Sequence, residues 1–171
     1  MAAQLQAIRA GIAKRLLDRT SAGSRVHTNR SSQVWSNGLP AILVYTKGET
    51  VERETTSSYK RTARVVIELV VAAENPEELL DDQADELAEQ VERLMLADPE
   101  LRGECGNLVL DARLVGYDMV LEDGGERLYA GGRLTWEFVY YQDITLGDPA
   151  EWAPWKTART AYSLDPSSAT P

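Results

Sequence analysis

This 171-residue chain has few of the side chains that most often carry enzyme chemistry, with one cysteine and one histidine. The single Cys105 excludes an intramolecular disulfide and a zinc cluster, and it favours a reducing compartment. No serine or cysteine lies in a G-x-S-x-G context, and the glycine pairs lack the spacing of a phosphate-binding loop. His27 lies in a polar connection, where a structural histidine is the better interpretation. We therefore predict no catalytic residue, no metal site and no cofactor.

Long hydrophobic runs are also missing. The longest apolar stretch, Val65 to Ala73, is interrupted by Glu68 and has the length of a strand, so we expect no membrane-spanning segment. The first twenty residues spread their basic side chains along a helical pattern instead of placing them before an apolar core, which argues against a secretion signal. An organellar transit peptide is the weaker alternative to a packed helix.

An excess of positive charge is absent as well, because the net charge is −9 and the isoelectric point about 4.7. This balance argues against a protein that wraps nucleic acid by neutralising phosphates. The charge is uneven, with six basic and one acidic residue over residues 1–30 and twelve acidic and two basic residues over 74–104. The two regions could pair between subunits, or each could be a solvated helix face.

Two amphipathic helices are predicted. The first covers residues 2–19 and ends before Gly23. The second begins at Asn75-Pro76-Glu77-Glu78, a strong start signal, and ends at Asp98-Pro99. The apolar stripe of the first comprises Leu5, Ile8, Ile12 and Leu16, and that of the second comprises Leu80, Ala84, Leu87, Val91 and Leu94. The acids of the second helix, Asp81, Asp82, Asp85, Glu86 and Glu89, fall on the opposite side, where a solvated face is a better interpretation than a metal site.

Four main strands are predicted, over residues 41–46, 62–73, 107–117 and 127–141. Alternation places Val65, Ile67, Leu69 and Val71 toward the helices. The last two strands are expected to form a hairpin with a turn at Asp123-Gly124-Gly125, and Gly131-Gly132 indicates a bulge or bend. Residues 25–40 read as an irregular connection. Residues 47–61 are too long for a tight turn and predict an extended hairpin arm or a mobile loop.

These elements predict an α+β fold with a mixed or antiparallel sheet of about four main strands and two helices packed on one face, in the order α-β-β-α-β-β. One domain spans residues 1–142, and residues 143–171 form an irregular C-terminal extension punctuated by proline. Trp152 and Trp155 in this extension could anchor on a partner subunit or fold back over the domain's own sheet.

Three motifs in this order carry a family resemblance: R-V-x-x-N-R from Arg25 to Arg30, L-P-A-I-L-V-Y from Leu39 to Tyr45, and the helix start at Asn75-Pro76. Over residues 3–141 the chain resembles the minor tail protein U type of tail terminator from long-tailed, non-contractile bacteriophages. The resemblance implies a structural virion protein and not an enzyme. It implies a homo-oligomeric, hexameric ring on the head-proximal end of the tail tube, assembled in the host bacterial cytoplasm. The ring ends tube polymerisation, contacts the tail tube protein and a head completion or neck protein, and lets DNA pass without specific binding.

Two groups of residues are candidate interfaces. Glu52, Arg53, Glu54, Lys60 and Arg61 are expected to contact the tube or adjacent subunits, because their segment is long and rich in paired charge. Arg25 and Arg30 are expected near a subunit boundary, with capping of the first helix as the alternative. The nearest other function is a head–tail joining or tail completion protein. A small enzyme or ligand-binding module is more distant and would show a closed pocket with convergent polar groups.

Overall fold

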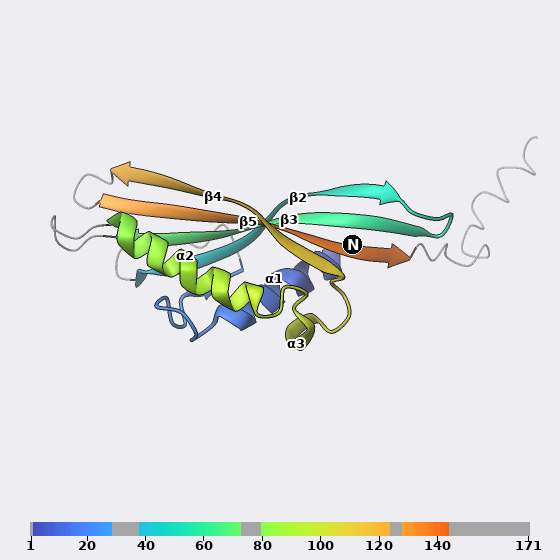
Figure 1. The fold of residues 1–171 in the computed structure, drawn as a ribbon, viewed down its shortest axis with the longest axis horizontal. Coiled ribbons are helices and arrows are strands. Elements are labelled where there is room, and N and C mark those ends of the chain that lie inside the picture. Colours follow the sequence, from blue (N-terminus) through green and yellow to red (C-terminus); the bar gives the residue numbers. More distant parts are fainter. Residues whose placement is uncertain (1, 29–37, 73–79, 124–127, 144–171) are drawn as a thin grey trace, which may run out of the picture.

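The fold is an α+β arrangement in which one five-stranded sheet carries its helices on a single face (Figure 1). The structure, a computed structural model, describes residues 2–28, 38–72, 80–123 and 128–143. The strand order is β1-β2-β3-β5-β4, with a parallel β1–β2 pair and antiparallel pairs elsewhere. The elements are α1 (Ala2–Leu16), β1 (Val26–His27), β2 (Ala41–Arg53), β3 (Ser58–Ala72), α2 (Leu80–Leu96), α3 (Arg102–Cys105), β4 (Asp111–Asp123) and β5 (Leu128–Asp143).

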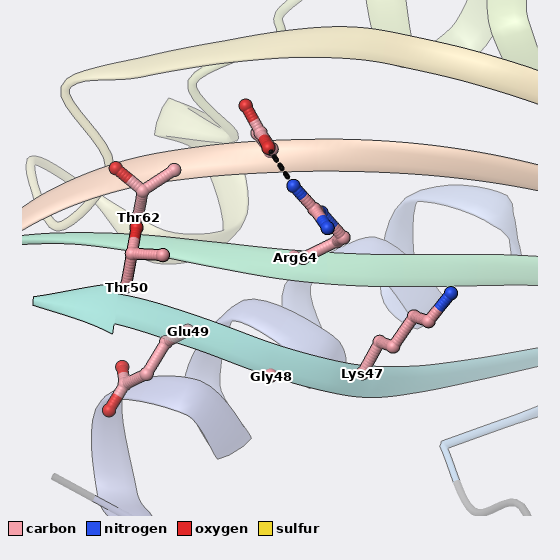
Figure 2. Close-up of a pocket in the computed structure, with 7 residues that line it drawn as sticks. Lys47, Gly48, Glu49, Thr50, Thr62 and Arg64 are labelled. Carbon is pink, nitrogen blue, oxygen red and sulfur yellow. Dashed lines mark hydrogen bonds and ion pairs between the residues drawn. The ribbon is translucent and has the colours of Figure 1, made fainter.

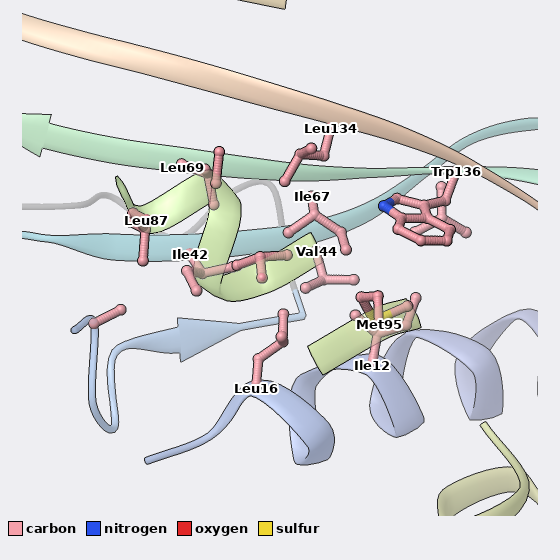
Figure 3. Close-up of a cluster of buried hydrophobic side chains, with 14 of the residues drawn as sticks. Ile12, Leu16, Ile42, Val44, Ile67, Leu69, Leu87, Met95, Leu134 and Trp136 are labelled. Atoms are coloured by element: carbon pink, nitrogen blue, oxygen red, sulfur yellow. The ribbon is translucent and has the colours of Figure 1, made fainter. Parts of the chain in front are cut away.

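The core forms where the predicted apolar stripes of the helices meet one face of the sheet (Figure 3). Ile8, Ile12 and Leu16 of α1 are fully buried, and the seam of α2 is buried from Leu80 to Met95. The sheet contributes Ile67 and its alternating neighbours on β3, together with a matching row on β5. Each such side chain contributes about 1.5–3 kcal/mol on burial, which is why the apolar spacing predicted these faces correctly. The five acids assigned to the opposite side of α2 are exposed, as expected.

Residues 47–61 form the extended hairpin arm and not a mobile loop. The antiparallel register of β2 and β3 continues to the pair Arg53↔Tyr59, and β5 pairs with β3 as far as Ser58↔Asp143. The backbone of β3 is therefore hydrogen-bonded on both sides along the arm. We define the hairpin arm as residues 47–64 of β2 and β3 with residues 137–143 of β5. The sequence of residues 47–61 is compatible with either an arm or a loop, because no continuous apolar face marks this polar segment as a strand pair.

The structure corrects several sequence predictions. The sheet has five strands instead of about four, because the two-residue β1 pairs with β2 inside the stretch predicted as irregular. A third helix, α3, precedes β4, so β4 begins at Asp111 and not near residue 107. The β4–β5 hairpin is present. The pairing of β5 with β3 and with β4 continues through Gly131-Gly132 without a bulge. Glycine at position 132 instead leaves room for the ring of Tyr117, because a Cβ there would lie 3.1 Å from it.

The two register shifts lie on the outer strands, between Thr46 and Gly48 of β2 and between Leu114 and Gly116 of β4. Thr46 and Leu114 stand in one row of the sheet, joined through Val65 and Trp136. A bulge bends its strand and increases the local twist. Two bulges at the same height account for the sharp twist at which the strands cross in Figure 1 and beyond which the hairpin arm extends.

Helix α1 is held against α3 by close packing and by one buried arginine. The Arg15 side chain, 8% exposed, pairs with Asp98 at 2.7 Å and with Glu104, and it donates to the carbonyl of Asp98. Burial opposes ionisation of Asp98, but the hydrogen bond from Arg15 and those from the amides of Arg102 and Gly103 together outweigh this effect and hold the Asp98 pKa below its usual value. No helix in the described part of the chain is long and apolar enough to cross a membrane.

Candidate functional site

The end of the hairpin arm is an ordered, charged turn. The amide of Glu54 donates to the carbonyl of Ser58 at 3.1 Å, and the hydroxyls of Thr55 and Ser58 lie 2.7 Å apart. Arg53 Nε donates to the carbonyl of Thr55 at 3.2 Å. Glu52, Arg53 and Glu54 are exposed here. Three of the five candidate arm residues are thus exposed to solvent at the end of the hairpin arm.

The other two candidates differ from each other. Lys60 is half-buried and stands opposite Glu52 in the strand register, on the face of the sheet away from the helices. Arg61 is 5% exposed and points to the opposite face, where it forms an ion pair with Glu49. A buried guanidinium cannot contact a partner without rearrangement, so Arg61 supports the arm from within.

This buried pair has a third member. Tyr140 of β5 is fully buried and donates its hydroxyl to Glu49 at 2.7 Å. Burial and this hydrogen bond raise the Tyr140 pKa well above its usual value, so the phenol stays protonated. Glu49 therefore accepts from two strands at once and ties β2, β3 and β5 together at the base of the arm.

The described helices all lie on one side of the sheet (Figure 1). The opposite face, which we call the open face, carries a row of charge. Gly48, Arg64, Glu137 and Arg113 are register partners across all four long strands. Arg64 and Arg113 donate to the two carboxylate oxygens of Glu137, at 2.8 and 2.7 Å. The hydrogen bond from Arg64, which has the larger effect, and that from Arg113 hold the Glu137 pKa below its usual value.

Burial within this row is unequal. The side chains of Arg64 and Arg113 are 49% and 72% exposed, while that of Glu137 is 11% exposed. The carboxylate therefore lies beneath its two guanidinium groups. Lys47, the bulge residue beside Gly48, is exposed and adds a third cation. We call Lys47, Arg64 and Arg113 the cationic row.

A shallow hollow of about 310 Å³ lies along this row, lined among others by Lys47, Thr62 and Arg64. Figure 2 shows Glu49 on the opposite side of β2, pointing toward the helices, while Lys47 and Arg64 border the hollow. A second hollow of about 260 Å³ on the same face includes Lys47 and Arg133 in its lining. The two linings combine the cations Lys47, Arg64 and Arg133 with three carboxylates and include no histidine or cysteine. Because the exposed cations stand above the nearly buried Glu137, the row suits contact with carboxylates or phosphates better than nucleophilic chemistry.

On the helix side of the sheet, the outer surface of α2 bears the opposite charge. Of the five exposed acids of α2, Glu89 pairs with Arg93 at 2.7 Å, and Asp85 accepts from the hydroxyl of Tyr117 at 3.0 Å. Burial of the phenol, with that hydrogen bond to Asp85, raises the Tyr117 pKa to about 12. The described residues contain no group of three or more histidine, cysteine or acidic side chains arranged to hold a metal ion.

The remaining candidates are placed as follows. Arg25 is half-buried, donating to the carbonyls of Pro40 at 2.7 Å and Ser21 at 3.3 Å, so it fastens the turn after α1 to the start of β2. His27 is half-buried in β1. Burial, with the nearby Glu104 carboxylate, raises the pKa of Cys105, which leaves the thiol protonated and weakly nucleophilic.

Arg30, Trp152 and Trp155 lie outside the described residues, as do the helix start at residues 75–78, the turn at residues 124–125 and the C-terminal extension.

Sequence reasoning missed the cationic row. None of Arg64, Arg113 and Glu137 is among the candidate interface residues that the sequence predicts. A signal exists, because each of the three lies between two apolar neighbours, in A-R-V, A-R-L and W-E-F. Strand order and register are needed to bring them together, and periodicity does not supply these.

The chain is similar to known proteins in two of three comparisons. A family model described as phage minor tail protein U matches residues 3–140. No curated protein sequence matches the chain significantly. Among solved structures, a chain of the "Virion of native gene transfer agent (GTA) particle" is 14% identical, with 82% of this chain and 99% of that chain covered and a TM-score of 0.37, which is too low to support an argument about function.

Proposed function

Because this chain belongs to the phage minor tail protein U family, it is a structural protein of the phage tail, and we propose that it forms the ring that caps the head-proximal end of the tail tube. In this role the ring ends tube polymerisation and offers its other face to a head completion protein. The ring is proposed to be a hexamer, without cofactor, metal or catalytic activity. It belongs to the virion and is assembled in the host bacterial cytoplasm.

The hairpin arm is the observation that carries this proposal. It extends past the helices in Figure 1, it is braced from beneath by Glu49, Arg61 and Tyr140, and it exposes charged side chains at its end. A braced arm loses little conformational entropy on binding, which favours its use as a contact to a tube subunit or an adjacent ring subunit. We propose that Glu52, Arg53, Glu54 and Lys60 make these contacts and that Arg61 keeps the arm in place.

The net charge of −9 supports passive passage of DNA through the ring. A strongly acidic subunit offers DNA little general attraction, so a molecule in transit is not retained. Arg25 and Arg30 are proposed to lie near a subunit boundary, and Trp152 and Trp155 to anchor on a neighbouring subunit or on the domain's own sheet.

The proposal is tested by a stop codon at this gene in the parent phage, with negative-stain electron microscopy of the lysate. Filled heads beside tails of irregular, excessive length are expected, because polymerisation has lost its stop. Headless tails of normal length would contradict a terminator. They would favour the second candidate, a head–tail joining or tail completion protein, which shares the small size and acidity of this chain.

The role of the arm is tested in the same phage by supplying variants from a plasmid. The double variant Arg53→Glu/Lys60→Glu is expected to lower the phage yield about tenfold or more, because it converts attraction into repulsion at each junction. Arg102→Glu is the matched control, since Arg102 is an exposed arginine on α3, away from the arm. An unchanged yield with the arm variant would remove the arm from the proposed interface.

A further inference from the structure

The open face and the outer side of α2 are opposite surfaces of one molecule with opposite charge. The cationic row presents three basic side chains above one nearly buried carboxylate. On α2, the side chains of Asp82, Glu86 and Glu89 follow one another at spacings of four and three residues and are all exposed. Such spacing aligns them along one side of the helix. We call these three the acidic stripe.

We propose that the cationic row of one copy of this chain binds the acidic stripe of α2 on the next copy. This inference rests on the proposed ring, for which it names the junction between subunits. Because the two surfaces lie on opposite sides of the sheet, the contact is heterologous, and repeated contacts of this kind close into a ring when the rotation between copies permits.

The dimensions of the two surfaces agree. Neighbouring strands lie about 4.8 Å apart, so the row from Lys47 on β2 to Arg113 on β4 extends roughly 14 Å across the sheet. A helix rises about 1.5 Å per residue, so the stripe from Asp82 to Glu89 extends roughly 10 Å. The long lysine and arginine side chains cover the remaining difference. A helix lying across the strands can therefore meet all three cations.

The charges on both surfaces are available for a partner. Lys47, Asp82 and Glu86 form no ion pair within the described residues. The pair between Glu89 and Arg93 is more than 70% exposed on both sides, and such pairs contribute only about 0–1 kcal/mol. Glu137 orients Arg64 and Arg113 outward from below. A nucleic acid phosphate chain is the competing ligand for such a row, but the net charge of −9 favours the acidic helix of a second copy.

Zero-length carbodiimide coupling tests the contact directly on purified wild-type tails. The expected product joins Lys47 to Asp82, Glu86 or Glu89, identified by peptide mass spectrometry. Such a link must be intermolecular, because the sheet separates Lys47 from α2 within one copy. Tails of normal length that carry this protein but yield no link between Lys47 and the acidic stripe would overturn the inference.

Variants test the charge requirement. Lys47→Glu is expected to lower the phage yield about tenfold, since it places like charges at every junction, whereas Lys47→Arg retains the yield. Adding Glu86→Lys to Lys47→Glu is expected to recover most of the loss. Lys47 is exposed and forms no ion pair within the part of the chain that the structure describes, so its replacement is expected to leave the fold intact. A normal yield with Lys47→Glu, or ultraviolet crosslinking of the row to DNA in place of the α2 link, would refute the contact.

The two proposals fail in different ways. Tails of normal length in the stop-codon phage would contradict the terminator role, yet a link from Lys47 to the acidic stripe would still establish the junction between copies. Overlong tails without that link would leave the terminator role standing and would refute this junction.

Discussion

Replacing Glu49 by glutamine should destabilise the protein by about 3 kcal/mol, because it removes the charge that compensates a buried arginine. The Arg61 side chain is 6% exposed and the Glu49 side chain 14%. Removing one partner of a buried ion pair typically costs about 3–5 kcal/mol, since the remaining charge is left without compensation. Glutamine still offers one oxygen to Tyr140 or Arg61, which places the expected loss at the lower end of that range.

Urea unfolding followed by circular dichroism measures this loss, and for a chain of this size it corresponds to a fall of roughly 6–12 °C in Tm. The matched control is Glu52→Gln. Glu52 lies three residues along the same strand but is exposed on the other face, so its replacement should change stability by less than about 0.5 kcal/mol.

A double-mutant cycle separates this pair from general damage to the arm. Arg61→Met removes the buried charge, so adding Glu49→Gln to it should cost at least about 1 kcal/mol less than Glu49→Gln costs alone. Amide hydrogen exchange should accelerate mainly in the hairpin arm and not in α2. A loss below about 1 kcal/mol for Glu49→Gln, or strict additivity with Arg61→Met, would refute the argument that this pair braces the arm.

Three further predictions concern the body of the domain. Gly11→Ala should destabilise the protein by about 1–3 kcal/mol in urea unfolding, because its new Cβ would lie 2.4 Å from Cys105 Sγ. Adding Cys105→Ala should recover part of this loss. A Gly11→Ala variant as stable as the wild type would contradict the close packing of α1 on α3. Because the pKa of Glu137 is lowered in the folded protein, its ionisation stabilises the fold. This contribution is fully present above the unfolded pKa of roughly 4.3 and is lost as the pH falls through the lower folded pKa. Unfolding measured from pH 2 to 7 should therefore show a weaker acid dependence in Glu137→Gln than in the wild type. Tyr117 should titrate near pH 12 in its carbon-13 NMR signal, and Asp85→Asn should lower this pKa because it removes the charged acceptor; an unchanged pKa would exclude Asp85 as a cause.

The two long helices and the buried face of the sheet could be predicted from the sequence, whereas the short α3 could not. The stripe of Ile8, Ile12 and Leu16 and the alternation around Ile67 on β3 appear in the core as expected. Apolar periodicity succeeds because the free energy of burial follows apolar area, and the period of each element fixes which side chains share a face. The family resemblance also rested on sequence motifs, and the match over residues 3–140 confirms it.

Only the tertiary structure decided where the polar residues of the strands lie. Lys60 and Arg61 are neighbours in the sequence, yet one lies on the open face and the other is buried against Glu49. The cationic row likewise joins Arg64 and Arg113, which are 49 residues apart and come together only through β5. Register, strand order and the two bulges set these positions. They depend on pairing between distant segments, whereas local periodicity depends only on which side of each segment is apolar.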